Sequence, residues 1–320
     1  MKAARIHRFG PPEVIVVDDL PRPTPAEDQV LVRVASAGVG PWDALIREGK
    51  SVVNSPLPLI LGSDLAGVVE AVGVGVTQFQ LGDKVYGVTN PEFVGAYAEF
   101  ALASSKMVAR KPESLTFTEG ASVPVIAVTA WQMLFDYAEA KPDQTVLIHG
   151  AGGSVGGYAV QFASQAGLHV FATASAEDAE YVRSLGATAV IDYQRDRFEE
   201  VIPMVDIVLD TVGGDTRKRS LRMIRPGGIL VSVVSEPMPR PDDLTDIRAV
   251  FFLVEVTTAR LDLVSNLFNQ GKLISRVGAV LPLSQVRTAH EMLSGAPHKR
   301  GKIVLSVGAV HSSPENKLTK

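Results

Sequence analysis

The 320-residue sequence contains no cysteine. This absence excludes disulfide bonds, thiolate zinc ligands, iron–sulfur clusters and thiol nucleophiles, so any chemistry must come from oxygen and nitrogen groups or from a bound cofactor. The sequence also contains no apolar run long enough to span a bilayer, and residues 1–8 lack the apolar stretch of a secretory signal. We therefore expect a cytoplasmic protein that does not enter a membrane.

Neither sign of charge dominates the chain. Thirty-one lysine and arginine residues against thirty-five aspartate and glutamate residues give a net charge of −4. Without a basic stripe or a long acidic tail, neither nucleic acid nor a membrane surface is an expected partner. With 46% hydrophobic residues the chain can bury a large core, and its length predicts two domains rather than one.

The texture of the sequence changes near residue 115. Before it, short β-branched runs separated by glycine and proline predict an all-β module. After it, helical patterns alternate with solid apolar strands, which is the βαβ rhythm of a parallel sheet covered on both faces. The strands expected in this second region are 145–149, 169–173, 189–191, 205–210, 229–234 and 250–254. Six strands in succession predict a doubly wound sheet.

A glycine-rich turn joins the first of these strands to a helix expected over 154–166. Gly150, Gly153 and Gly156 have a first gap one residue longer than the usual dinucleotide fingerprint, so the context of strand and helix carries the argument. Glycine allows a tight turn and a close backbone approach, and the helix N-terminus offers N–H groups to phosphate. The pattern predicts a bound dinucleotide; the alternative is a tight turn without a ligand.

The end of the second strand bears on the choice of dinucleotide. An acidic residue there holds the ribose 2′-hydroxyl of NAD, but this strand ends in small residues and Ser175, which favours NADPH. Glu177 and Asp178 would repel a 2′-phosphate if they pointed inward. We favour the alternative that both cap the next helix, residues 177–185, and face solvent. Arg183 is either a phosphate partner or a surface charge.

Many ordered motifs together carry a family resemblance. The chain resembles the zinc-independent quinone oxidoreductase branch, which includes ζ-crystallin, of the medium-chain dehydrogenase/reductase family. The motifs are Leu61-Gly62-Ser63-Asp64-Leu65-Ala66-Gly67, Gly82-Asp83-Lys84-Val85, Gly95-Ala96-Tyr97-Ala98-Glu99, Thr129-Ala130-Trp131, Leu209-Asp210-Thr211-Val212-Gly213-Gly214, Pro226-Gly227-Gly228 and Gly301-Lys302-Ile303-Val304-Leu305.

The resemblance implies an α/β fold of two domains. A chaperonin-10-like (GroES-like) β domain would span residues 1–122 and 275–320, and a Rossmann domain with a doubly wound parallel sheet would span 123–274. It also implies which residues line the cofactor: Thr129, Gly150, Gly153, Ser154, Val155, Gly156, Ser175, Tyr193, Val212, Gly213, Phe251, Phe252 and Lys302. Tyr193, Phe251, Phe252 and Lys302 could equally serve packing.

The same resemblance bears on metal and substrate. Where related alcohol dehydrogenases hold zinc through cysteine and a His-Glu pair, this chain has residues 41–43 and Ser63-Asp64, so we expect no metal. Without a Lewis acid, the suitable hydride acceptors are quinones and α,β-unsaturated carbonyls. The substrate-bordering segment contains Trp42 and Asp43 as candidate catalytic residues. Trp42 would shape an apolar pocket; Asp43 would be an acid, a polar contact or a helix N-cap.

These observations leave three functions open. The first is an NADPH-dependent reductase of quinones or enones, in which solvent protonates the product because residues 40–60 contain no tyrosine to donate a proton. The second is an enoyl-thioester reductase, and the third is an NADPH-binding structural or sensor protein with little turnover. The resemblance also implies a homodimer formed through the sheet edge near residues 250–254.

Overall fold

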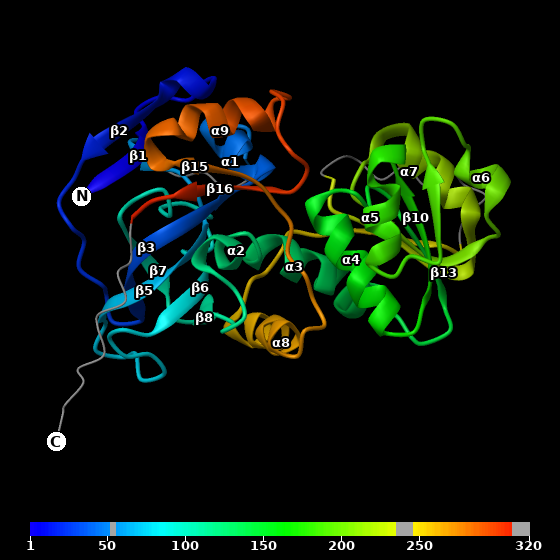
Figure 1. The fold of residues 1–320 in the computed structure, drawn as a ribbon, viewed down its shortest axis with the longest axis horizontal. Helices are drawn as coiled ribbons and strands as arrows, with labels where there is room; N and C mark the ends of the chain where they lie inside the picture. Colours follow the sequence, from blue (N-terminus) through cyan, green and yellow to red (C-terminus); the bar gives the residue numbers. More distant parts are fainter. Residues whose placement is uncertain (52–55, 235–245, 309–320) are drawn as a thin grey trace. The chain divides into compact units, whose positions relative to one another are not determined.

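The computed structural model describes residues 1–51, 56–234 and 246–308, which form two compact units (Figure 1). The described residues of 1–124, 256–269 and 277–320 form the first unit, and those of 125–255 and 270–276 form the second. In this part of the chain no helix is long and apolar enough to cross a membrane. The last stretch of the predicted first domain, residues 309–320, lies outside the described residues.

The first unit is built on β-sheets, as the short β-branched runs predict. A seven-stranded sheet has the order β15-β16-β3-β5-β6-β8, with β7 paired to β3, and a three-stranded sheet has the order β2-β1-β4. The strands are β1 (Lys2–Ile6), β2 (Ile15–Asp19), β3 (Gln29–Val39), β4 (Leu59–Ile60), β5 (Asp64–Val72), β6 (Lys84–Val88), β7 (Phe100–Ser104), β8 (Val108–Arg110), β15 (Val277–Pro282) and β16 (Lys302–Ser306). Four short helices accompany them: α1 (Pro41–Arg47), α2 (Phe117–Ala121), α8 (Thr258–Asn269) and α9 (Val286–Leu293).

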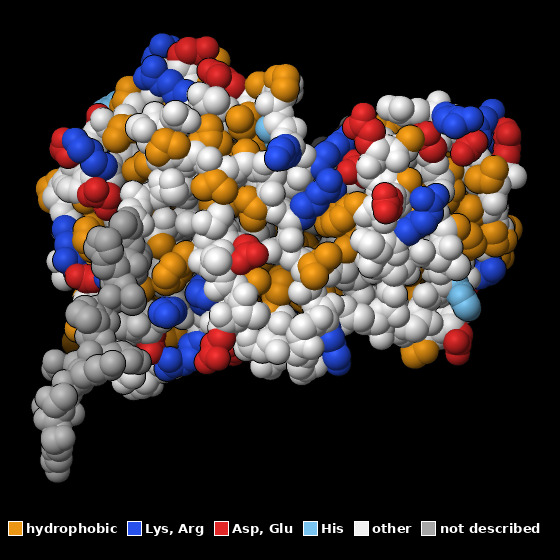
Figure 2. Space-filling view, in the orientation of Figure 1, with side chains coloured by type: hydrophobic (Ala, Val, Ile, Leu, Met, Phe, Trp, Pro, Cys, Tyr) orange, Lys and Arg blue, Asp and Glu red, His pale blue; other side chains and the backbone are white. Residues whose placement is uncertain are grey.

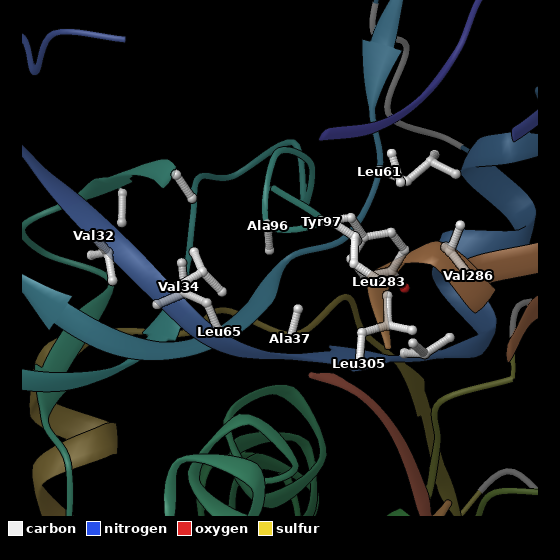
Figure 3. Close-up of a cluster of buried hydrophobic side chains, with 14 of the residues drawn as sticks. Val32, Val34, Ala37, Leu61, Leu65, Ala96, Tyr97, Leu283, Val286 and Leu305 are labelled. Carbon is white, nitrogen blue, oxygen red and sulfur yellow. The ribbon is translucent and has the colours of Figure 1, made fainter. Parts of the chain in front are cut away.

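Strand β3 organises this unit, because it pairs with β5, β7 and β16. Its side chains and those of its neighbours form one apolar core, within which the ring of Tyr97 lies close to Leu283 (Figure 3). Tyr97 is fully buried. The burial of these apolar side chains fixes the ends of β3 and β5, which adjoin the candidate site residues of this unit.

The second unit contains one six-stranded parallel sheet with the order β11-β10-β9-β12-β13-β14. This is the doubly wound order of a dinucleotide-binding sheet, and it confirms the predicted α/β fold. The elements are α3 (Pro124–Trp131), β9 (Thr145–Ile148), α4 (Ser154–Gln165), β10 (His169–Ala174), α5 (Ala179–Ser184), β11 (Ala189–Asp192), α6 (Phe198–Val201), β12 (Val205–Asp210), α7 (Gly214–Ser220), β13 (Ile224–Ser232) and β14 (Arg248–Phe251).

Both faces of this sheet are covered, as the unbroken apolar strands predict. Figure 1 shows α4 and α5 on one side of the sheet and α6 on the other. On the α6 side, Phe198 and Ile202 pack with Leu147 and Val208 from the central strands. From β9 the chain continues to β10 on one side of the sheet, and from β12 it continues to β13 on the other side. The carboxyl ends of the adjacent strands β9 and β12 therefore flank the switch point where such sheets bind ligands.

Helix α8 belongs to a different unit from the one predicted, because the prediction assigned residues 123–274 to a single domain. It belongs to the first unit because polar contacts join it to β6 and β8. The Tyr86 hydroxyl donates to the Leu261 carbonyl over 2.6 Å, and the Thr258 hydroxyl donates to the Val108 carbonyl over 2.7 Å. A helical pattern alone does not reveal such partners.

Two buried histidines stay neutral in the folded chain. His290 on α9 accepts from Arg47 over 2.8 Å, and His149 at the end of β9 contacts two hydroxyl groups. Burial lowers the pKa of His290 to about 3 and that of His149 to about 4. The unfolded chain takes up these protons near pH 6.5, so acidification below this value favours unfolding.

The substitution His290→Asn tests this linkage. Asparagine keeps an acceptor for Arg47 and cannot titrate, so the free energy of unfolding should fall less steeply between pH 6.5 and 4.5, by up to about 1.4 kcal/mol per pH unit. Urea unfolding at several pH values measures it. The variant is expected to be less stable than the wild type at pH 8 because the smaller side chain leaves a cavity; an unchanged slope would contradict the linkage.

Candidate functional site

The glycine turn after β9 has no room for side chains at two of its positions. Gly150 has a φ of +71°, and a Cβ there would lie 2.4 Å from the Thr211 hydroxyl oxygen. A Cβ on Gly156 would lie 2.3 Å from the Gly150 carbonyl oxygen. Helix α4 therefore packs directly on the turn, as the sequence context of the glycines predicts.

The remaining glycine of the pattern, Gly153, lies against the Gly150 carbonyl at the start of α4. Gly153 is the N-cap of α4 and lacks a side-chain cap. Among the described residues, the Gly150 carbonyl oxygen at 3.1 Å is the one atom that a Cβ on Gly153 would meet within 4 Å. The first amides of a helix, here those of Ser154 and Val155, have no intrahelical acceptor and carry the positive end of the helix dipole. This cradle fits the diphosphate of a dinucleotide.

His149, the residue before the turn, is held by two hydroxyl groups. Its Nδ1 lies 3.0 Å from the Thr173 hydroxyl and its Nε2 lies 2.8 Å from the Ser220 hydroxyl. The Thr173 hydroxyl also accepts from the Gly150 amide over 3.4 Å. The His149 ring thus bonds to side-chain hydroxyls. Because its ring is buried and both of its nitrogens contact hydroxyl groups, His149 positions the turn.

Several predicted cofactor residues gather at the carboxyl edge of the sheet beside the turn. The Thr211 hydroxyl donates to the His149 carbonyl over 2.8 Å, which places the segment after β12 against the turn. Val212 and Gly213 in that segment donate their amides to Asp210, and the Val212 side chain is 52% exposed. Tyr193, which follows β11, is 57% exposed. Exposed apolar side chains at this edge suit contact with a nucleoside.

Ser175 directly follows the last residue of β10, and Asp178 does not face solvent. The prediction that Asp178 caps a helix and points outward is wrong: it is 2% exposed, while Glu177 is exposed. Asp178 packs against Gly152 of the turn, accepts from the Ser175 hydroxyl over 3.2 Å and pairs with Arg276 over 3.0 Å. It occupies the N-cap position of α5 without a capping bond, because Arg276 draws the carboxylate inward.

Three other predicted cofactor residues have packing partners of their own. Thr129 on α3 is buried, and its hydroxyl donates to the Val125 carbonyl over 2.7 Å. Phe252 is buried and stacks on Tyr137 with ring centroids 4.3 Å apart. Phe251, at the end of β14, is partly exposed. Their contact with a cofactor stays a prediction.

The first unit contains a buried charge cluster built from Trp42, Ser63, Asp64 and Lys302. The Lys302 ammonium lies 3.0 Å from the Asp64 carboxylate, with both side chains almost fully buried. It also lies over the Trp42 ring, 4.1 Å from the centroid, and the indole N–H donates to the Ser63 hydroxyl over 3.1 Å. The segments expected from the resemblance to replace the zinc ligands therefore meet around an ammonium group.

Asp43 adjoins this cluster and is fully buried. Its Oδ2 accepts from the Gly40 amide and from the Tyr97 hydroxyl, each over 2.8 Å. Asp43 is thus the third residue of α1 and not its N-cap, although it does accept from the N-cap amide. Burial raises the pKa of Asp43 to about 7, against the opposing effects of the Gly40 amide, the Lys302 ammonium and the Tyr97 hydroxyl.

Within the described ranges, no group of three or more histidine, cysteine, aspartate or glutamate side chains could hold a metal ion. Asp43 and Asp64 have a lysine and a tyrosine as neighbours, a donor set unlike that of a tetrahedral zinc site. Independence from zinc stays a prediction.

The sequence did not reveal the polar partners within these groups. Lys302 was expected to line a cofactor, yet its ammonium pairs with Asp64. The Tyr97 hydroxyl reaches Asp43 from a distant loop, and Arg276 reaches Asp178 from a segment 98 residues further along the chain. A buried charge needs a partner, and this requirement indicates that such pairs exist. It does not indicate which residue supplies the partner.

Two neighbouring glycines of α4 provide a matched test of the turn. Gly156→Ala should abolish measurable dinucleotide binding, because its Cβ must displace the Gly150 carbonyl. Gly157→Ala should retain binding and gain up to about 1 kcal/mol of stability, because its nearest neighbour would be 3.4 Å away and alanine favours helix. Fluorescence titration and urea unfolding measure both effects; equal binding by the two variants would contradict the role of the turn.

The raised pKa of Asp43 predicts a second stability effect. The folded chain holds this proton up to about pH 7 and the unfolded chain releases it near pH 4, so stability is lost as pH rises between these values. Asp43→Asn mimics the protonated carboxyl and cannot titrate. The free energy of unfolding of the variant should therefore fall less between pH 5 and pH 8 than that of the wild type. Urea unfolding at both pH values measures this; parallel changes in the two proteins would refute it.

Comparisons with known proteins agree with this architecture. A family described as "Alcohol dehydrogenase GroES-like domain" matches residues 26–113, and one described as "Zinc-binding dehydrogenase" matches residues 185–305. Quinone oxidoreductase from Mus musculus is 31% identical over 324 residues, which cover 95% of this chain and 97% of the mouse protein.

Solved structures extend the match to the whole fold. Quinone oxidoreductase from Coxiella burnetii has a TM-score of 0.89 and 34% identity, covering 96% of this chain and 99% of that one. A mycobacterial protein in complex with NADPH has a TM-score of 0.84 and 29% identity, covering 96% and 100%. The predicted resemblance is confirmed: the chain is an oxidoreductase that belongs to the medium-chain dehydrogenase/reductase family, in its quinone oxidoreductase (ζ-crystallin-like) branch.

Proposed function

We propose that the chain is an NADPH-dependent, zinc-independent reductase of quinones or α,β-unsaturated carbonyls. The observation that carries the proposal is the cradle at the N-terminus of α4, where the glycine turn packs closely on the helix and the first helix amides lack intrahelical acceptors. When bound, the nicotinamide group supplies the hydride. The amides of Ser154 and Val155 hold the diphosphate, and Val212 and Tyr193 offer apolar contact at the same edge of the sheet.

The preference for NADPH is supported by the end of β10. The residue after β10 is Ser175, which is small and uncharged, and the buried carboxylate beside it, Asp178, is paired with Arg276. A paired carboxylate repels a 2′-phosphate less than a lone one. The mycobacterial relative bound to NADPH also supports this preference.

The choice of substrate is supported by the buried charge cluster. Lys302 and Trp42 occupy the region where the resemblance places a catalytic zinc in related dehydrogenases, so a hydride acceptor should not need a Lewis acid. Quinones and enones meet this requirement, because conjugation spreads the charge that hydride transfer creates. The similarity to proteins named quinone oxidoreductase supports the same class.

Trp42 and Asp43 have different roles in this proposal. Trp42 is partly exposed and borders the substrate with its indole ring, whereas Asp43 is fully buried and cannot touch a substrate in this conformation. Asp43 instead fixes the start of α1 through the Gly40 amide, and so it positions Trp42. Solvent then protonates the product. The partners proposed are the small-molecule acceptor and a second copy of the chain in a cytoplasmic homodimer, both carried over from the resemblance.

Figure 2 shows basic and acidic side chains interspersed over the face in view, rather than gathered by sign. This distribution accords with the balanced composition and supports a small-molecule substrate over a nucleic acid.

Steady-state oxidation of NADPH tests the proposal with a panel of quinones, enones and enoyl thioesters. Turnover should occur with the first two classes and survive dialysis against a chelator. Asp43→Asn should preserve the shape of the pH–rate profile, because Asp43 positions Trp42 and does not transfer the proton. Turnover with enoyl thioesters alone would favour the acyl-reductase alternative, and tight NADPH binding without any turnover would refute both enzyme functions.

A further inference from the structure

We propose that Arg276 reads the 2′-phosphate of the cofactor and that Asp178 holds the guanidinium in place for this task. The inference rests on the proposed function, because it concerns the same dinucleotide site. It adds a specificity-determining residue from the segment 270–276, which returns to the second unit after α8 and contains no glycine-rich motif.

The guanidinium of Arg276 is oriented by two contacts. Its Nη1 lies 3.0 Å from Asp178 Oδ1, and its central carbon, Cζ, lies 4.0 Å from the centroid of the Tyr181 ring. The Arg276 side chain is 32% exposed, whereas that of Asp178 is 3% exposed. A guanidinium has five N–H groups in a fixed fork, so one bond to Asp178 leaves donors for an oxyanion on the exposed side.

The pair of Asp178 and Arg276 lies beside the turn, where the phosphate on the adenosine ribose of the dinucleotide would bind. Asp178 packs against Gly152, so the carboxylate touches the phosphate-binding turn itself. Its other oxygen accepts from the Ser175 hydroxyl at the end of β10. In a doubly wound sheet, the end of this strand is where the ribose of the dinucleotide lies. Arg276 is therefore held beside the ribose 2′ position.

The charges around the pair favour a phosphate only if Arg276 is present. Asp178 and the exposed Glu177 are both negative and would repel a 2′-phosphate. Arg276 neutralises Asp178 and offers bidentate hydrogen bonds, which suit phosphate geometry. Arg183 on α5 is also cationic, but it is exposed. It supplies a matched control for the loss of one positive charge.

Fluorescence titration of the full chain with NADPH and with NADH tests the inference. Arg276→Met should raise the Kd for NADPH by about 10-fold to 100-fold, as expected for the loss of a charge-assisted bond, and change the Kd for NADH by less than about 3-fold. Arg183→Met should leave both values unchanged. Asp178→Asn keeps the packing against Gly152 but loses the ion pair that holds the guanidinium, so it should raise the Kd for NADPH, by less than Arg276→Met does.

Adenosine 2′,5′-bisphosphate and 5′-AMP provide a second measurement on the same variants. The wild type should bind the bisphosphate more tightly, and Arg276→Met should remove that difference. If the wild type prefers NADPH but Arg276→Met weakens both dinucleotides equally or neither, Arg276 has no specificity role and the proposed function stands. If the wild type prefers NADH, both this inference and the NADPH dependence of the proposed function are overturned.

Discussion

The close approach of helix α4 to the turn after β9 is the constraint on which the second unit depends. Gly156 lies so near the Gly150 carbonyl that no Cβ fits, and Gly150 lies equally near the Thr211 hydroxyl of the neighbouring strand. This packing fixes the start of α4, whose N-cap is Gly153 and whose first amides have no side-chain cap. An anion site therefore follows from the absence of side chains, because a larger residue would move the helix and its dipole away from the turn.

The chain buries charges in both units, and each buried carboxylate has a cation or a donor beside it. Lys302 accompanies Asp64, Tyr97 accompanies Asp43, and Arg276 accompanies Asp178. Removing an ion from water costs several kcal/mol, so an apolar replacement would often be at least as stable. These pairs fix the orientation of side chains at the edge of the chemistry: Trp42 beneath the Lys302 ammonium, and the guanidinium of Arg276 beside the turn. We infer that they are kept for positioning rather than for stability.

Regular elements with a strong apolar period could be predicted from the sequence, and weaker ones could not. Strand β12 was predicted with both ends correct, and α4 with its last residue misplaced by one, because each has a continuous apolar face. Strand β1 was missed, since its five residues contain two charged side chains and depend on pairing with β2. Helix α8 was expected in the other domain, because its polar bonds to Tyr86 and Val108 are invisible to a local pattern.

The sequence by itself determined the glycine-rich turn, the succession of strands in a doubly wound sheet and the family, because each is encoded by residues that are neighbours along the chain. Only the tertiary structure decided where the charges point. Asp178 was expected to face solvent, and it turns inward because Arg276, nearly a hundred residues later, offers a cation there. Lys302 and Asp64 meet for the same reason. Electrostatic partners are chosen by proximity in space, and a buried charge is satisfied by whichever residue the fold brings within reach.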